Sequence, residues 1–113
     1  MRILEERITI EELRDVAGGT FGDLVKAVVD VKRRLVAIDA ELHSDLEALL
    51  MDDGSRQNDL WGINFYPGLS GDDFLEFDSM INLRPSLGNM SRGVDDAGLR
   101  EEITGITDEW IER

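Results

Sequence analysis

Hydrophobic residues recur along this chain at two spacings, one typical of amphipathic helices and one typical of half-buried strands. Helical spacing appears first in "RITIEELRDVAGG", where Thr9 and Glu12 form the capping-box pattern and the glycine pair ends the segment. It returns in "VDDAGLREEITGITDEWIER", with Asp95 or Asp96 placed to cap the start. The pattern therefore predicts an N-terminal helix over 9–18 and a C-terminal helix over 96–112.

Strand patterns occupy the middle of the chain. "LVKAVVDVKRRLVAID" is rich in β-branched residues and is interrupted by "KRR", which predicts strands near 24–31 and 35–41 joined by a tight turn. "LWGINFYP" and "FLEFDSMINLRP" alternate apolar and polar residues. We expect a strand in the first and one long strand from Phe74 to Arg84 in the second.

The segment "ELHSDLEALL" is compatible with two structures. Ser44 and Glu47 fit a second capping box, and the leucines give a helical stripe, whereas the following "DDGS" suits a hairpin turn. A meander of antiparallel strands uses every element, so residues 43–51 are expected to form a strand, with the helix as the alternative.

These elements predict an α+β fold in one globular domain spanning residues 1–113. We expect an antiparallel sheet of about four to five strands, covered on one face by the N-terminal and C-terminal helices.

Charge and composition then limit the classes of partner and compartment. The 25 acidic residues outnumber the 12 basic ones, for a net charge of -13, so neither nucleic acid nor an anionic membrane is expected as a partner. Cysteine is absent, which excludes disulfides and thiolate sites. No apolar run is long enough to span a bilayer and the N-terminus is charged, so a cytoplasmic protein is expected.

Several strings give the chain a family resemblance. "AVVDV", "AELHSDLEALLMDDGS", "DLWGINFYP" and "FDSMINLRPSLGNMSRGV" together resemble the prokaryotic family DUF5674, over nearly the full length. The resemblance implies a small cytoplasmic protein of bacteria or archaea. It implies no activity, cofactor or catalytic residue.

The only histidine of the chain lies among acidic residues. His43 is the candidate general acid or base, with Asp78 to orient it. Asp45 and Glu47 are the nearest candidates for holding a divalent cation, but the second histidine of a two-histidine iron site is missing. A solvated acidic edge is favoured, so no metal site is predicted.

Polar residues around the end of the expected long strand form the second candidate site. Arg84 and Arg92 flank a loop rich in glycine and serine, which suits a phosphate or carboxylate. Amide side chains add polar contacts; the candidates are Asn64, Asn82 and Asn89. The competing interpretation is a long turn whose arginines pair with surface acids.

Two functions follow from these residues. A binding or protein-interaction module is favoured, through a protein partner or self-association, because no catalytic motif is present. The alternative is a small enzyme or ligand-binding protein that takes an anionic metabolite through Arg84, Arg92 and His43. The residues identify no cofactor.

Overall fold

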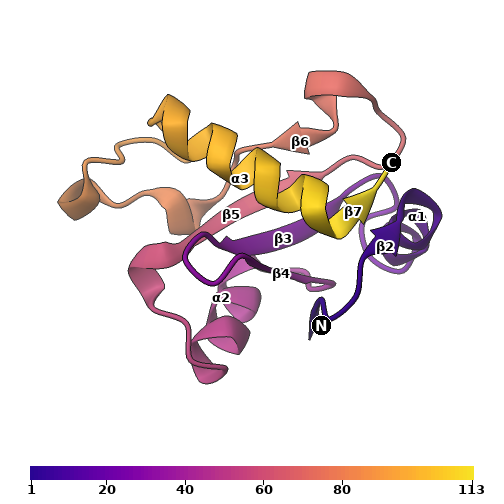
Figure 1. The fold of residues 1–113 in the computed structure, drawn as a ribbon, viewed down its shortest axis with the longest axis horizontal. Helices are drawn as coiled ribbons and strands as arrows, with labels where there is room; N and C mark the ends of the chain where they lie inside the picture. Colours follow the sequence, from indigo (N-terminus) through magenta and orange to yellow (C-terminus); the bar gives the residue numbers. More distant parts are fainter.

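The computed structural model describes all 113 residues, and its framework is one five-stranded antiparallel sheet (Figure 1). The strand order is β1-β4-β3-β5-β6. The bounds are β1 (Arg2–Ile3), β3 (Val25–Asp30), β4 (Leu35–Ile38), β5 (Leu60–Phe65) and β6 (Leu75–Glu76). The long central pair, β3 and β5, runs in register from Val25 opposite Phe65 to Asp30 opposite Leu60, whereas both edge strands are short. Short edges limit the unpaired backbone that could join another sheet.

A second, two-stranded sheet joins the two ends of the chain. β2 (Ile8–Thr9) pairs in parallel with β7 (Ile111–Glu112). Each of these strands is continuous with a helix, so the pairing fixes the start of one helix beside the end of the other. Short 3-10 turns complete the chain at Gln57–Asp59, Gly71–Asp73, Met80–Asn82 and Pro85–Leu87.

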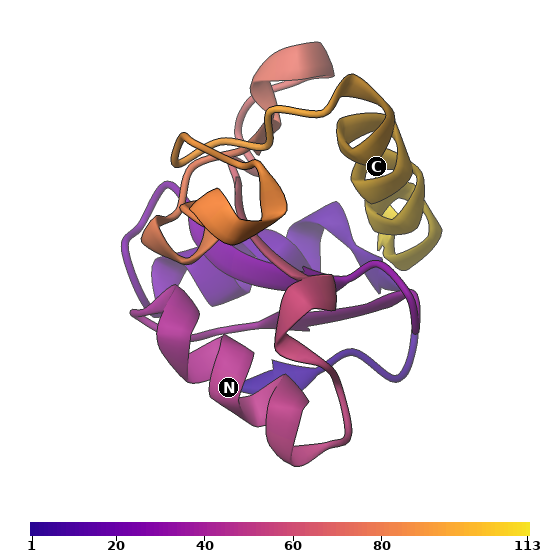
Figure 2. The ribbon, with the colours of Figure 1, turned by 90° about the vertical axis from the view of Figure 1, so that its left-hand side faces the viewer.

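Three helices cover both faces of the sheet. α1 (Ile10–Gly18) and α3 (Ala97–Trp110) pack on one face, where Leu13, Ile103 and Ile106 join the larger hydrophobic core. α2 (His43–Asp52) packs on the other face, where Leu46 and Leu50 contact β3 and β4 in a smaller core. Figure 2 shows α2 and α3 on opposite sides of the sheet. None of the helices has the length and the apolar content needed to cross a membrane.

The α+β class, the terminal helices and the central hairpin are confirmed. Thr9 caps α1 through a capping box with Glu12, and Asp96 caps α3 by accepting the backbone N–H of Leu99. The hairpin turn contains Arg34 at a φ of 57°, a left-handed conformation that non-glycine residues adopt infrequently.

Two expectations for the middle of the chain are wrong. Residues 43–52 form a helix, because the α2 side of β3 and β4 is apolar and requires a cover. The long strand expected from Phe74 to Arg84 is reduced to β6, and the chain then leaves the sheet in 3-10 turns. The sheet is therefore covered on both faces, where the sequence predicted cover on one.

Candidate functional site

The carboxamide of Asn82 replaces the strand that is missing beside β5. Its Oδ1 accepts the backbone N–H of Gly62 at 2.8 Å, and its Nδ2 donates to the carbonyl of the same residue at 2.9 Å. Nδ2 also donates to the carbonyl of Arg92 at 2.9 Å, and the residue is completely buried. Asn82 thus satisfies the edge backbone as a strand partner would, and it attaches the following loop to the sheet.

The space for this arrangement depends on Gly62. A Cβ at that position would lie 2.5 Å from the Cβ of Ser79, which is closer than such atoms approach in proteins. The 3-10 turn at Met80–Asn82 therefore crosses β5 directly over a residue without a side chain.

Asn89 closes the loop that follows. Its Nδ2 donates to the carbonyls of Asn82, at 2.7 Å, and Gly93, at 2.9 Å, while its Oδ1 accepts the N–H of Asp95 at 2.8 Å. The backbones of Arg84 and Asn89 also bond to each other in both directions. This network fixes the path of residues 80–90, whose only regular structure is two 3-10 turns.

The two arginines predicted to hold an anion each contact a carboxylate of the chain. Arg84 donates to Glu47 at 3.2 Å, with only 11% of its side chain exposed, and its guanidinium lies 5.0 Å from the ring centroid of Trp61. Burial is the main cause that lowers the pKa of Arg84, and the Glu47 charge opposes it. Arg92 donates to Asp78 at 2.8 Å with 57% of its side chain exposed. Both cations are therefore already neutralised by internal acids.

His43 lies at the start of α2 and faces the sheet. It is buried, and its Nε2–H donates to the carbonyl of Ile63 at 2.8 Å. Burial lowers the pKa of His43 most, and the Ile63 carbonyl and more weakly Asn64 and Asp78 act against that shift. The ring is therefore neutral near pH 7 and one of its nitrogens is engaged.

Asn64 lies on the same face and bonds within the chain. Its Nδ2 donates to Glu76 at 2.9 Å and to the carbonyl of Asp78 at 3.2 Å, and the hydroxyl of Tyr66 donates to the same Glu76 oxygen at 3.2 Å. The Oδ1 of Asn64 has no partner. The polar groups near His43 are thus largely occupied with holding β6 and the next turn against β5.

The acidic neighbours of His43 do not gather around it. Asp45 is exposed on the outer side of α2, while Glu47 points to Arg84. The structure brings no three histidine, aspartate or glutamate side chains together in an arrangement that could hold a metal ion. Together, the polar side chains of the candidate site hold the segment from β6 to the start of α3 in place.

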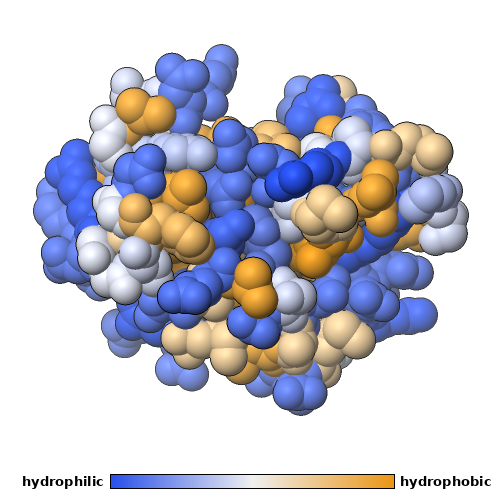
Figure 3. All heavy atoms as spheres, turned by 180° about the vertical axis from the view of Figure 1, so that it is seen from behind, coloured by the Kyte–Doolittle hydropathy of each residue, from blue (hydrophilic) through white to orange (hydrophobic).

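The braced segment presents an apolar surface that the sequence analysis did not identify. We call residues 80–90 the apolar loop, because four of its large apolar side chains are exposed: Met80, Leu83, Leu87 and Met90. The exposed fractions reach 63% at Met80 and 66% at Met90. Figure 2 shows the loop between α2 and α3 at one end of the molecule. On the back face, apolar atoms occur on the side of the loop, on the opposite side and along the lower edge (Figure 3).

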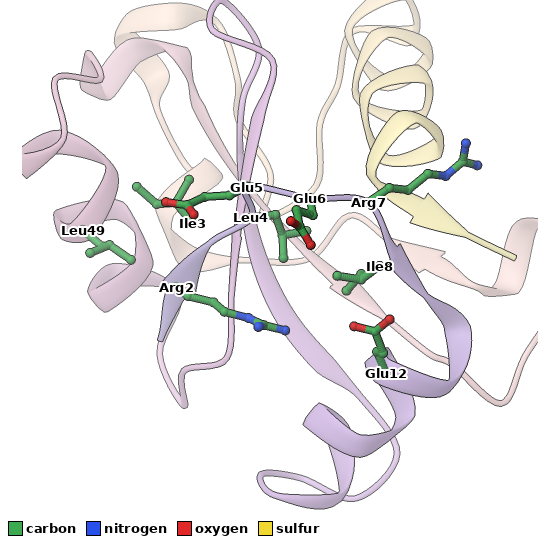
Figure 4. A pocket seen from close by; sticks show the side chains of 9 residues that line it. All are labelled: Arg2, Ile3, Leu4, Glu5, Glu6, Arg7, Ile8, Glu12 and Leu49. Carbon is green, nitrogen blue, oxygen red and sulfur yellow. The ribbon is translucent and has the colours of Figure 1, made fainter.

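A different hollow, of about 540 Å³, lies between β1, the connection to β2 and the start of α1 (Figure 4). Arg2 and Glu12 point into it from opposite sides, above the buried side chains of Leu4 and Ile8. Glu12 already accepts bonds from Thr9 in the capping box. None of the buried polar atoms that lack a partner lies in this hollow. Its lining serves the start of α1 and the link between the two sheets.

Comparison with known proteins gives a family and no function. The family described as "Protein of unknown function (DUF5674)" matches residues 2–110, so the chain belongs to that family, which confirms the resemblance. Neither the curated proteins nor the solved structures include a match.

Proposed function

We propose that this DUF5674 protein is a protein-interaction module whose binding surface is the apolar loop. The observation that carries the proposal is a rigid loop, held by buried asparagine side chains, that exposes large apolar groups. Exposing them costs free energy in water, roughly 25 cal/mol for each Å² of apolar surface that could otherwise be buried. Several large apolar side chains exposed within one short segment of a small protein are typical of a surface that another protein covers.

Methionine supports this choice of surface. All four methionines of the chain are exposed, and two of them lie at the ends of the apolar loop. The unbranched thioether adapts to different partner shapes, which is why methionine is common at binding surfaces. A braced backbone with adaptable side chains limits the entropy lost on binding.

The alternative function, catalysis on an anionic metabolite, has less support. Arg84 and Arg92 hold the chain's own carboxylates, and an anion would have to displace Glu47 or Asp78 first. The buried His43 donates to a backbone carbonyl. The proposal therefore favours binding over catalysis.

The proposal is tested by quantitative affinity capture from cells of the native host. The wild-type chain and the double variant Met80→Gln/Met90→Gln are compared, with Leu69→Gln as the matched control. Leu69 is 51% exposed but lies in the turn before β6, away from the apolar loop. We expect specific proteins retained by the wild type and the control, and reduced at least about fivefold by the double variant, a change of ~1 kcal/mol.

Two results would contradict the proposal. One is equal retention by all three chains, which would place any binding elsewhere. The other is retention of nothing together with a monomeric wild-type chain in sedimentation at high protein concentration. Circular dichroism of each variant shows that the fold is intact.

A further inference from the structure

A hollow of about 720 Å³ adjoins the apolar loop on the side of α3. Apolar side chains line part of it: Trp61 from β5, Leu87 from the loop and Leu99 from α3. Trp61 is almost fully buried, whereas Leu87 is exposed. The hollow therefore continues the apolar surface of the loop inwards to an aromatic ring.

Carboxylates surround this apolar lining. Asp95, Asp96 and Glu102 line the hollow, and no lysine or arginine does. Bonds from Ser91 and from the N–H of Met90 lower the pKa of Asp95, so it stays ionised. Asp96 is the N-cap of α3, and Glu102 is exposed on the second turn of that helix. The rim of the hollow therefore carries negative charge. The carboxylate of Glu102 makes no hydrogen bond or ion pair within the chain.

We propose that the partner bound by the apolar loop presents a basic segment, in which a lysine or arginine side chain enters this hollow while neighbouring apolar side chains cover the loop. This inference rests on the proposed function and assigns the chemistry of the partner.

The shape and charge of the hollow fit such a side chain in two ways. The methylene stem of a lysine or arginine packs on apolar surface, here Leu87, Leu99 and the edge of Trp61. Its charged end then reaches the carboxylates at the rim. Hydrogen bonds between a cation and a carboxylate are stronger than those between neutral groups. An acidic partner would meet three like charges at the same place.

The net charge of the chain points to the same partner. At -13, the protein attracts a cationic segment at long range and repels both a second copy of itself and an anionic lipid surface. Self-association through the loop would also have to bring two acidic rims together. The occupant favoured by charge is therefore a different protein with a cationic segment.

The test uses two synthetic amphipathic peptides and NMR of the full chain. The peptides share the same leucines and differ only in carrying lysine or glutamate at every polar position. The chain has two tryptophans, whose indole N–H signals serve as probes. Trp61 lines the hollow, while the indole of Trp110 donates to the carbonyl of Arg34 elsewhere and serves as the internal control.

The lysine peptide is expected to shift the Trp61 signal in a saturable manner and to leave Trp110 unchanged. Glu102→Gln should weaken its binding by about two- to fivefold, the usual effect of one exposed charge. Glu101→Gln should have no effect, because Glu101 is exposed on the same helix but lies outside the hollow. The glutamate peptide should not bind.

The inference is overturned if both peptides bind equally, if the lysine peptide leaves Trp61 unmoved, or if the two glutamine variants bind alike. Failure of the inference alone differs from failure of the proposed function. In the first case, partners captured through the apolar loop stay bound in high salt and are not displaced by the lysine peptide. In the second case, Met80→Gln/Met90→Gln captures the same proteins as the wild type.

Discussion

Replacing Asn82 with alanine should remove the central brace of the apolar loop. The carboxamide bonds to both backbone groups of Gly62 and to the carbonyl of Arg92, all away from water. The Arg92 carbonyl keeps a second partner, the N–H of Ser79, at 2.9 Å. The alanine variant therefore leaves two backbone groups of Gly62 without a partner.

Each unsatisfied buried group costs about 1–3 kcal/mol, so we expect the free energy of unfolding to fall by roughly 2–6 kcal/mol. This is a large part of the ~5–15 kcal/mol that stabilises a typical domain. The effect should be measured by urea unfolding, followed by tryptophan fluorescence and by circular dichroism. Asn58→Ala is the control, because Asn58 is exposed in a 3-10 turn and its replacement should change the free energy by less than about 0.5 kcal/mol.

A loss below about 1 kcal/mol for Asn82→Ala, with the same dependence on urea, would refute this reasoning. It would mean that water or a shifted backbone satisfies Gly62 as well as the carboxamide does. The loop would then not be held in the manner described.

Three further predictions test other parts of the fold. Gly62→Ala should destabilise the protein by about 1–3 kcal/mol, because the new Cβ would collide with Ser79. Gly105→Ala should stabilise it by about 0.5–1 kcal/mol, because Gly105 lies on α3 with open space around it. Equal effects of the two variants in thermal unfolding would contradict the close approach of Ser79 to Gly62. Arg84→Ala should cost roughly 3 kcal/mol, because it leaves Glu47, whose side chain is only 14% exposed, without its cation. The exposed Arg92→Ala should cost less than about 1 kcal/mol in urea unfolding, and the reverse order would show that burial does not set these energies. Burial lowers the pKa of folded His43 below its unfolded value near 6.5. The unfolded chain therefore binds the extra proton, and the free energy of unfolding falls as the pH drops below about 6.5. His43→Gln should lose this pH dependence in urea unfolding, and an unchanged slope would exclude His43 as its source.

Local signals predicted the parts of the fold whose hydrogen bonds are local. The capping box of α1, the Asp96 cap of α3, the apolar stripes of both helices and the turn between β3 and β4 are each complete within a few residues. The capping box expected at Ser44 and Glu47 does not form, because α2 starts after Leu42 without a side-chain cap. Residues 43–52 needed tertiary information, because the same leucines suit a helix or a strand until the second face of the sheet is known. One sequence signal did indicate that face: residues 27–29 are the apolar run "AVV", as in a strand covered on both sides. The structure buries β3 continuously at residues 27–30.

The segment from Phe74 to Arg84 shows where alternation misleads. Leu75, Phe77, Ile81 and Leu83 fit the period of a strand, but the Asn82 side chain occupies the hydrogen-bonding groups that a longer β6 would use. That substitution depends on Gly62, which is distant in sequence, so no local rule reveals it. Once β6 ends early, Leu83 becomes exposed, and an expected core position becomes part of the apolar loop.

The polar site predicted from the sequence stays a prediction. Asn64, Asn82, Asn89, Arg84 and Arg92 do lie around one segment, yet their side chains bond mainly to the chain itself. The missed feature was the exposure of the apolar residues between them. The only sequence signal for it was two methionines ten positions apart around a loop with two asparagines, a proline and a glycine.

Photo-crosslinking from within the apolar loop shows directly whether another protein contacts this surface. A photoreactive phenylalanine analogue replaces Leu83 in one chain and Leu69 in a second chain, both exposed leucines in turns, and each chain is irradiated in cells of the native host. We expect discrete protein adducts from position 83 that are absent at position 69 and that decrease when Met80→Gln/Met90→Gln is added. No adduct at position 83, or the same adducts at both positions, would contradict the claim that the apolar loop is the binding surface.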